Sequence, residues 1–291
     1  MSKGLWLRLA EATSTAPLAG AGQAGGFETS LLATGICVLG VWVFIRSIRP
    51  SKLLLRRMPG RPNSLHPLAV PALYVLYLGA VLLAQMALAA IQGIELVSVT
   101  PPMTVLVPAM IVGQAVLIPG ALALAANGFP NGVRRGLGFS ARRWRIDSAR
   151  AVVATLAAWP VCIGLLVLTS WIIPPKPEHA HPILSAMSGA SPSWLAVMVL
   201  TAAVIVPIGE ELLFRGLAQS LLRRHFGPWP AVLVASAIFA AAHYTQPQAV
   251  PSLFVLAVVI GYNYERTGRL LTPILIHTLF NAANMALRLI G

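Results

Sequence analysis

The chain has 291 residues, of which 57% are hydrophobic and 10% are charged, and its mean hydropathy is +0.78. Soluble domains carry about 25% charged residues, so this composition excludes an ordinary soluble globular protein. The formal net charge of +13 does not indicate a nucleic-acid partner, because the basic residues stand at the ends of apolar stretches.

Eight apolar stretches follow one another along the chain. Residues 1–26 precede them and are rich in small and polar residues, which predicts a flexible N-terminal tail. About 20 residues of helix span a bilayer, so the pattern predicts an all-α, polytopic integral membrane bundle with about eight transmembrane helices. The sixth and seventh stretches are short for lipid-exposed spans, and we expect neighbouring helices to shield them. The predicted helices are 27–45, 68–91, 102–126, 151–173, 194–222, 230–243, 249–265 and 271–290.

A strongly basic segment divides this apolar chain into two membrane parts. Residues 131–150 carry six arginines together with Phe139 and Trp144, a mixture typical of a segment that lies at anionic cytoplasmic headgroups. We therefore expect N-terminal transmembrane helices over 27–130, then this basic cytoplasmic interfacial segment, and a second transmembrane part over 151–291.

The basic residues also predict how the chain is oriented in the membrane. Lysine and arginine are retained on the cytoplasmic side, and 16 of the 21 basic residues fall in alternate connections on one side. Four fall on the other side, and Arg215 lies inside the fifth predicted helix. This asymmetry predicts an integral protein of the cytoplasmic membrane with both termini extracytoplasmic. The 16 residues are Arg46, Arg49, Lys52, Arg56, Arg57, Arg61, Arg134, Arg135, Arg142, Arg143, Arg145, Arg150, Arg223, Arg224, Arg266 and Arg269.

Two of the eight carboxylates lie inside an apolar stretch. Glu210 and Glu211 are adjacent in the sequence VIVPIGEELLFRG, whereas the other six lie in the tail, in connections or at helix ends. An ionised side chain at bilayer depth costs on the order of a few kcal/mol unless it is paired or faces a polar cavity. A functional role is therefore the default interpretation of this pair.

Helical spacing distinguishes the two glutamates. Glu211 and Arg215 are spaced i, i+4 and are predicted to form an ion pair on one helix face. Glu210 has no such partner and lies about 100° around the helix. In an apolar site it is suited to act as a general base.

Two histidines and an amide lie in later apolar stretches. His277 and Asn281 are spaced i, i+4 on the eighth predicted helix, and His243 ends the sixth. At about 1.5 Å per residue, these side chains and Glu210 reach the membrane interior from the same side. A carboxylate with a histidine can hold and deprotonate a water, while a second histidine and an amide can stabilise an oxyanion. The residues therefore predict a hydrolase, with neither a GxSxG serine motif nor an HExxH zinc motif in the sequence.

Three motifs, taken in order, resemble those of the CPBP family of intramembrane proteases, which is also called Abi or CAAX-protease-like. The resemblance covers about residues 194–291 and implies an intramembrane endopeptidase that cleaves a membrane-associated protein or peptide, with residues 151–291 as its catalytic core. The motifs are Glu210-Glu211-x-x-x-Arg215, Phe239-x-x-x-His243 and His277-x-x-x-Asn281.

The resemblance also implies roles for the residues of these motifs. Glu210 would activate the attacking water with help from His243. His277 and Asn281 would stabilise the oxyanion. Glu211 also counts among the catalytic residues and would shape the site together with Arg215.

Two further residues and a metal ion belong to the same expectation. Arg215 and Phe239 would shape the site. The family is commonly described as metalloproteases, which makes zinc a candidate cofactor with Glu210, His243 and His277 as candidate ligands. A metal-free glutamate mechanism uses the same side chains, so both alternatives are open at this point.

A non-catalytic role is the alternative to a protease. A transporter, an immunity factor or a scaffold protein could use buried glutamates and histidines to bind a proton, an ion or a partner. Inverted repeats would favour a transporter, and no convincing similarity relates the two halves of the chain. The sequence specifies neither the substrate nor the oligomeric state.

Overall fold

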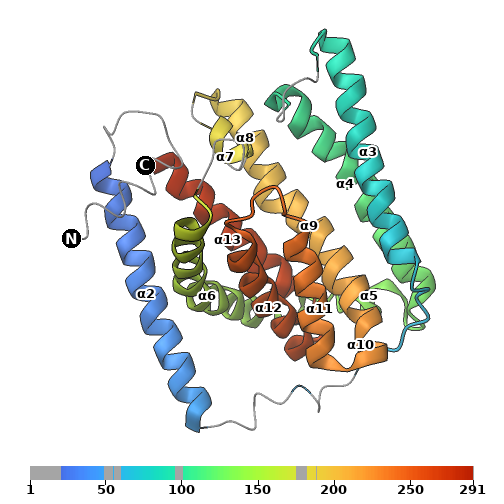
Figure 1. Cartoon of the computed structure of the whole chain (residues 1–291). Coiled ribbons are helices and arrows are strands. Elements are labelled where there is room, and N and C mark those ends of the chain that lie inside the picture. Colours follow the sequence, from blue (N-terminus) through green and yellow to red (C-terminus); the bar gives the residue numbers. More distant parts are fainter. Residues whose placement is uncertain are drawn as a thin grey trace.

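The computed structural model describes residues 21–48, 55, 60–95, 101–174, 182–187 and 189–290. Every regular element within these residues is helical, which confirms the predicted all-α class. Each of the eight predicted helices has a counterpart here, in the predicted order (Figure 1).

The fifth predicted helix is one continuous helix, Pro192–Phe226, which we call the composite helix. Two of its five segments, η5 and η6, are π-helical. The composite helix comprises α8 (Pro192–Leu200), η5 (Thr201–Ile205), α9 (Val206–Glu211), η6 (Leu212–Gln219) and α10 (Ser220–Phe226). The other elements are α2 (Ala21–Ile48), α3 (Ala69–Gln92), α4 (Met103–Gly128), α5 (Gly132–Gly136), η3 (Ala141–Arg143), α6 (Trp144–Ile172), α7 (Pro182–Ala186), α11 (Pro228–Ala241), α12 (Val250–Thr267) and α13 (Leu271–Ile290).

Five helices among the described residues are long and apolar enough to cross a membrane. They are α3, α4, α6, the composite helix and α13, while the apolar parts of α2 and α11 are shorter. The structure thus supports an integral membrane protein with five candidate spans, and the predicted number of about eight spans is not shown. The side of the membrane on which the termini lie stays a prediction.

Two helices begin earlier than the sequence pattern predicts. Helix α2 begins at Ala21, so residues 21–26 are helical rather than part of the predicted tail, whose residues 1–20 lie outside the described part of the chain. Helix α6 begins at Trp144, seven residues before the predicted start and inside the predicted interfacial segment. Its first turn is held by Asp147, which is fully buried and accepts a hydrogen bond from Thr272 of α13.

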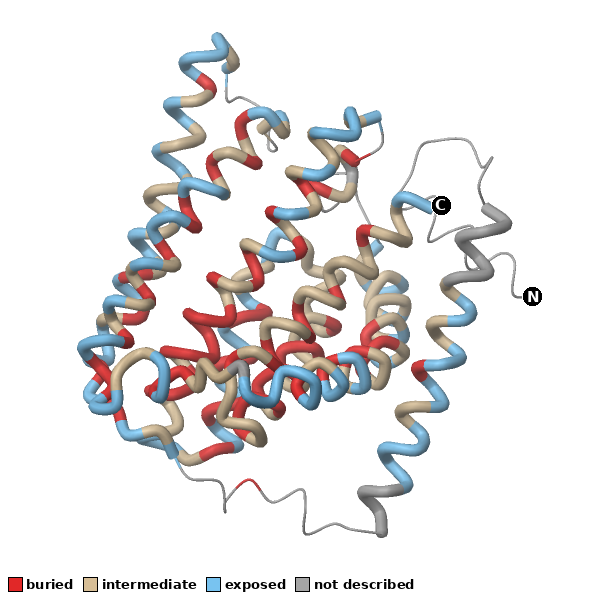
Figure 2. The backbone as a smooth tube through the Cα atoms, turned by 180° about the vertical axis from the view of Figure 1, so that it is seen from behind, coloured by how far each residue is buried: buried red, intermediate tan, exposed pale blue. Residues whose placement is uncertain are grey.

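The composite helix lies at the centre of the packing. Its apolar window is 56% buried, compared with 6% for α3. Helices α4, α11, α12 and α13 contact it, whereas α3 packs mainly on α4, and α2 packs on α6. Figure 2 shows the buried positions gathered toward the centre and lower part of the bundle, where these helices meet.

A dense apolar core surrounds the second π-helical segment. Leu212 and Leu217 of η6 pack with Leu117 of α4, Phe239 of α11 and Tyr264 of α12, all of them almost fully buried. Close packing of this kind resists small displacements. It therefore fixes the helix segment that directly follows the two glutamates.

The segment before α3 is tied to the end of α10. Nη1 of Arg224 donates to the carbonyl oxygen of Asn63 over 2.7 Å, and the Asn63 side chain donates to the carbonyl oxygen of Ser220 over 3.0 Å. In Figure 1, α3 begins and α10 ends on the lower side of the bundle, opposite the C-terminus. Basic connections that are far apart in sequence thus meet at one end of the molecule, which we call the basic end.

Candidate active site

A proline and the π-helical turns shape the helix around the two glutamates. Segments η5 and η6 flank α9, which ends at Glu211. Pro207 has no backbone N–H, so a carbonyl oxygen in the preceding turn lacks its helical donor. The Asn281 side chain donates to the carbonyl oxygen of Ala202 in that turn over 3.0 Å. π-helical turns are frequent at functional sites, and here one is tied to α13.

Glu211 lies fully buried between a cation and a histidine. Its Oε1 accepts from Nη1 of Arg215 over 2.9 Å and from Nδ1 of His277 over 2.8 Å. The predicted i, i+4 ion pair of Glu211 with Arg215 is therefore confirmed. Removing one partner of a buried pair leaves an uncompensated charge and costs about 3–5 kcal/mol, so this pair supports the local fold as well as the charge balance.

Arg215 connects the glutamate segment to two neighbouring helices. Its Nη2 donates to the carbonyl oxygen of Ala257 in α12 over 3.1 Å, and its guanidinium carbon lies 4.8 Å from the ring centroid of Phe239 in α11. The Phe239 ring is also 4.9 Å from the His243 ring and 5.7 Å from the His277 ring, centroid to centroid. Phe239 thus packs between the arginine and both histidines.

Glu210 is the accessible carboxylate of the adjacent pair. Its side chain is 18% exposed, and its Oε2 lies 3.7 Å from Nε2 of His277. This separation is too long for a direct hydrogen bond, and it leaves both atoms able to contact one water. His277 therefore faces Glu211 with Nδ1 and Glu210 with Nε2.

His243, just after the end of α11, is held by that helix, and its predicted help to Glu210 stays a prediction. Its Nδ1 donates to the carbonyl oxygen of Phe239 over 2.9 Å. Among the described residues, the histidine within ion-pairing distance of Glu210 is His277. The backbone bond engages Nδ1 and leaves Nε2 of His243 as the available ring nitrogen.

Zinc requires a closer grouping of donors than the described residues provide. Catalytic zinc takes three protein ligands and keeps one position open. No three His, Cys, Asp or Glu side chains in the described ranges lie close enough together to hold a metal ion. Of the candidate ligands Glu210, His243 and His277, the last already faces a carboxylate with each ring nitrogen. No catalytic step through zinc follows from this arrangement.

Asn281 lies one turn beyond His277 on α13. One of its two amide N–H groups donates to the carbonyl oxygen of Ala202. An amide has two N–H donors, so the second is available to a ligand. The predicted contribution of Asn281 and His277 to an oxyanion site stays a prediction.

Sequence reasoning misses Gln114 of α4, which lies against the glutamate segment. A Cβ atom at Gly209 would lie 1.9 Å from Oε1 of Gln114, so the amide occupies the space beside the residue that precedes Glu210. Gln114 is 1% exposed, and neither amide atom has a hydrogen-bond partner of good geometry among the described residues, although Tyr77 lies nearby. A polar residue within an otherwise apolar helix is the sequence signal that could have identified it.

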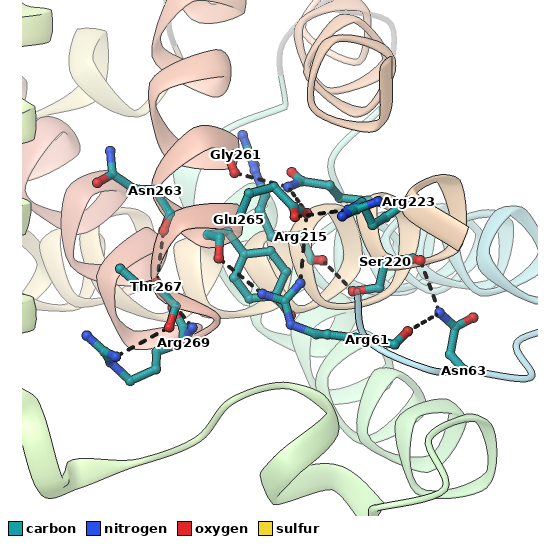
Figure 3. Close-up of polar contacts among 12 residues, drawn as sticks. Arg61, Asn63, Arg215, Ser220, Arg223, Gly261, Asn263, Glu265, Thr267 and Arg269 are labelled. Carbon is teal, nitrogen blue, oxygen red and sulfur yellow. Dashed lines mark hydrogen bonds and ion pairs between the residues drawn. The ribbon is translucent and has the colours of Figure 1, made fainter. Parts of the chain in front are cut away.

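Sequence reasoning places Glu265 at a helix end and gives it no partner, and the structure buries it in a network at the basic end (Figure 3). Its side chain is 2% exposed and lies 3.4 Å from Arg223 and 3.9 Å from Arg61. Gln219 donates to it over 3.0 Å, and the Arg61 guanidinium stacks 3.7 Å from the Tyr264 ring centroid. These partners come from distant parts of the sequence, so local spacing gives no sign of them.

Comparison with known protein families gives a match in the part of the chain that holds this site. No solved structure matches the chain. An uncharacterized 24.3 kDa protein of Escherichia coli is 32% identical over 83 residues, which make up 27% of this chain and 38% of the relative, so the match spans well under half of that protein. Residues 192–283 match the model of the type II CAAX prenyl endopeptidase Rce1-like family and include all the predicted site residues. The chain thus carries, over residues 192–283, a domain of the Rce1-like type II CAAX prenyl endopeptidase family.

Proposed function

We propose that this protein is an intramembrane endopeptidase that hydrolyses a peptide bond of a membrane-associated protein or peptide. The observation that carries the proposal is the arrangement of Glu211, His277 and Glu210. One histidine faces a buried carboxylate with one nitrogen and an accessible carboxylate with the other. The match of residues 192–283 to a family of endopeptidases supports the same reaction.

Glu211 is the proposed positioning residue for His277. A histidine whose Nδ1–H donates to a buried carboxylate is held in one orientation. Because Arg215 balances the charge of Glu211, that carboxylate can stay ionised in an apolar region. Nε2 of His277 is then directed toward the water beside Glu210.

Glu210 is the proposed general base. Its carboxylate takes a proton from the water while the water oxygen bonds to the substrate carbonyl carbon. The same proton then passes to the leaving amine nitrogen as the carbon–nitrogen bond breaks. His243, whose Nε2 is available, is proposed to hold the water from a second direction.

Asn281 and His277 are the proposed oxyanion donors. Asn281 retains one amide N–H beside its bond to Ala202. Nε2 of His277 is proposed to donate to the substrate oxygen as negative charge develops there, while Nδ1 stays bonded to Glu211. One such donor contributes about 10²- to 10³-fold to the rate of comparable reactions.

A membrane-associated substrate follows from the position of the proposed base. Glu210 belongs to the composite helix, a candidate membrane span, and the apolar core of the protein surrounds its segment. A peptide that reaches this carboxylate must enter from the membrane or be anchored there. The name of the matching family makes prenylated CAAX peptides the first substrates to examine.

The experiment is cleavage of quenched fluorescent peptides by the detergent-purified full chain. The peptide set combines prenylated CAAX peptides with unprenylated and transmembrane peptides. We expect cleavage by the wild type, loss of cleavage in Glu210→Gln, and unchanged cleavage in the control Glu95→Gln, whose residue is exposed in the connection after α3. A wild-type rate in Glu210→Gln would refute the proposed base. Peptide binding by a wild type that cleaves no peptide of the set would favour the non-catalytic alternative.

A further inference from the structure

A second polar site lies at the basic end, away from the proposed protease site. A hollow of about 410 Å³ is formed there by two chain segments that are far apart in sequence. This volume is in the range of sites that bind small molecules. Its lining residues are Arg134, Arg135, Gly138, Phe139, Ser140 and Arg269.

Glycine at position 138 lets the rim of this hollow close tightly. Gly138 has φ +74°, and a Cβ atom there would lie 1.9 Å from the carbonyl oxygen of Gly268 in the connection between α12 and α13. The neighbouring Leu137 is fully buried and packs against Gly216 of the composite helix. The loop after α5 is therefore anchored on both sides, and the hollow is formed before any ligand binds.

Among the described residues, a carboxylate balances only one of the three arginine charges that line the hollow. Nε of Arg269 donates to both carboxylate oxygens of Asp147, over 2.7 and 3.0 Å. This hydrogen bonding raises the pKa of Arg269, which keeps its guanidinium charged and fixed as one wall. Arg134 and Arg135 form no ion pair with any described carboxylate. Two positive charges in the hollow thus remain available to an anion.

The hollow lies where the chain passes between two candidate spans. Helix α4 ends at Gly128 and α6 begins at Trp144, so the segment between them lies at a membrane surface if both helices cross. Trp144 is 54% exposed, and tryptophan is enriched at the level of lipid headgroups. An anion at this level is most abundant as a phospholipid headgroup.

A second hollow nearby has the same charge but a different construction. It is lined by five consecutive residues, Arg142 to Ile146, and no other described residue contributes to it. Arginines on one exposed turn attract anions only through their charge. The first hollow instead combines α5, the following loop and the α12–α13 connection, which is the construction of a specific site.

We infer that the hollow at Arg134, Arg135 and Arg269 binds the phosphate group of an anionic phospholipid. Arginine recognises phosphate through two parallel N–H donors, and the hydroxyl of Ser140 provides a further donor. Phe139 offers an apolar surface to the part of the lipid beyond the phosphate. The inference does not depend on the proposed protease activity.

The test measures the melting temperature and lipid binding of the full chain in detergent. The probes are phosphatidylglycerol, phosphatidylcholine and inorganic phosphate, added separately. We expect phosphatidylglycerol to raise the melting temperature of the wild type more than phosphatidylcholine does, and inorganic phosphate to have no effect at matched concentration. Removal of two headgroup contacts in Arg134→Gln/Arg135→Gln should weaken phosphatidylglycerol binding about 30-fold.

Two matched variants separate a built site from general attraction to a basic surface. Arg142→Gln/Arg143→Gln removes equal charge from the second hollow and should weaken phosphatidylglycerol binding much less, because only general attraction is lost there. Arg134→Lys/Arg135→Lys keeps the charge, loses the paired donors and should weaken binding. Equal losses in the two glutamine double variants, full binding by the lysine variant, or no preference for phosphatidylglycerol in the wild type would each overturn the inference. An equal response to inorganic phosphate would reject the lipid as the source of the phosphate.

Discussion

The bundle contains two buried networks of glutamates and basic side chains, and the two networks have different roles. At the basic end, Glu265 is 2% exposed and lies within 4 Å of both Arg61 and Arg223. In the composite helix, Glu210 and Glu211 are adjacent and one of them remains 18% exposed. The first network joins chain segments into one unit (Figure 3), and the second leaves a carboxylate within reach of a ligand.

Charge balance and access distinguish these networks, while burial alone does not. One carboxylate faces two arginines around Glu265, so its charge is fully compensated. Two carboxylates share Arg215 and His277 in the composite helix, so Glu210 is left without an arginine partner. A closed ion pair stabilises an interface, whereas an accessible carboxylate beside a histidine can exchange a proton with water.

The largest expected effect comes from removing one charge in each network. Glu210→Gln should lower kcat/KM for peptide cleavage by about 10²- to 10⁴-fold, the usual contribution of a general base, and should leave the melting temperature unchanged. Glu265→Gln should lower the melting temperature, because two arginines lose their carboxylate, and should retain cleavage. Both quantities are measured on the same detergent-purified samples.

A reversal of these two results would remove the distinction between the networks. If Glu265→Gln abolished cleavage at an unchanged melting temperature, the basic end would belong to the catalytic machinery. If Glu210→Gln unfolded the protein, the accessible carboxylate would be a structural residue.

The next effect is a loss of stability at Glu211. Glu211→Gln leaves Arg215 buried without a counter-charge, which should destabilise the protein by about 3–5 kcal/mol. Thermal and denaturant unfolding in detergent measure this loss. The double variant Glu211→Leu/Arg215→Leu should recover much of the stability, because an apolar replacement removes both buried charges together.

The same double variant tests whether Glu211 acts through His277. We expect it to remain inactive even when it is folded, because Nδ1 of His277 then has no carboxylate to orient it. Recovery of cleavage together with stability would limit Glu211 to a structural role.

The parts of the site that sequence predicts are those set by local helical geometry. The i, i+4 spacing of Glu211 and Arg215 is enough to place their charges 2.9 Å apart on one helix. The position and order of the main helices can also be predicted from the sequence, because long apolar stretches mark them. These features depend on residues within one or two turns of each other.

Features that depend on packing between distant segments could not be predicted. The spacing of the motifs does not show that His277 lies within 3.7 Å of Glu210, or that His243 donates to the backbone. The predicted help of His243 to Glu210 stays a prediction. The early start of α6 depends in the same way on Asp147, whose partners lie at the start of α13. The sequence of one helix indicates how far along its axis each residue lies. How that helix is rotated against its neighbours depends on side-chain packing between helices.

A smaller effect is expected where Gln114 meets the glutamate segment. In Gly209→Ala the new Cβ would displace the Gln114 amide, since 1.9 Å is far below any contact distance. A shift of about 1 Å next to a catalytic group can cost up to about 100-fold in rate, so we expect cleavage to fall within that range. Gly79→Ala is the control, because a Cβ there has no neighbour within 4 Å. An unchanged rate in Gly209→Ala would separate Gln114 from the site.

The smallest expected effect is that of metal removal, and it separates the two mechanisms that the motifs allow. A zinc enzyme requires three protein ligands around the ion, whereas both nitrogens of His277 face carboxylates and no described group of three donors is close enough to hold a metal. We therefore expect cleavage to survive treatment with a chelator, and elemental analysis to find zinc well below one atom per chain. Activity that is lost on chelation and restored by zinc, together with loss of the bound metal in His277→Ala, would instead require the side chains to regroup around an ion.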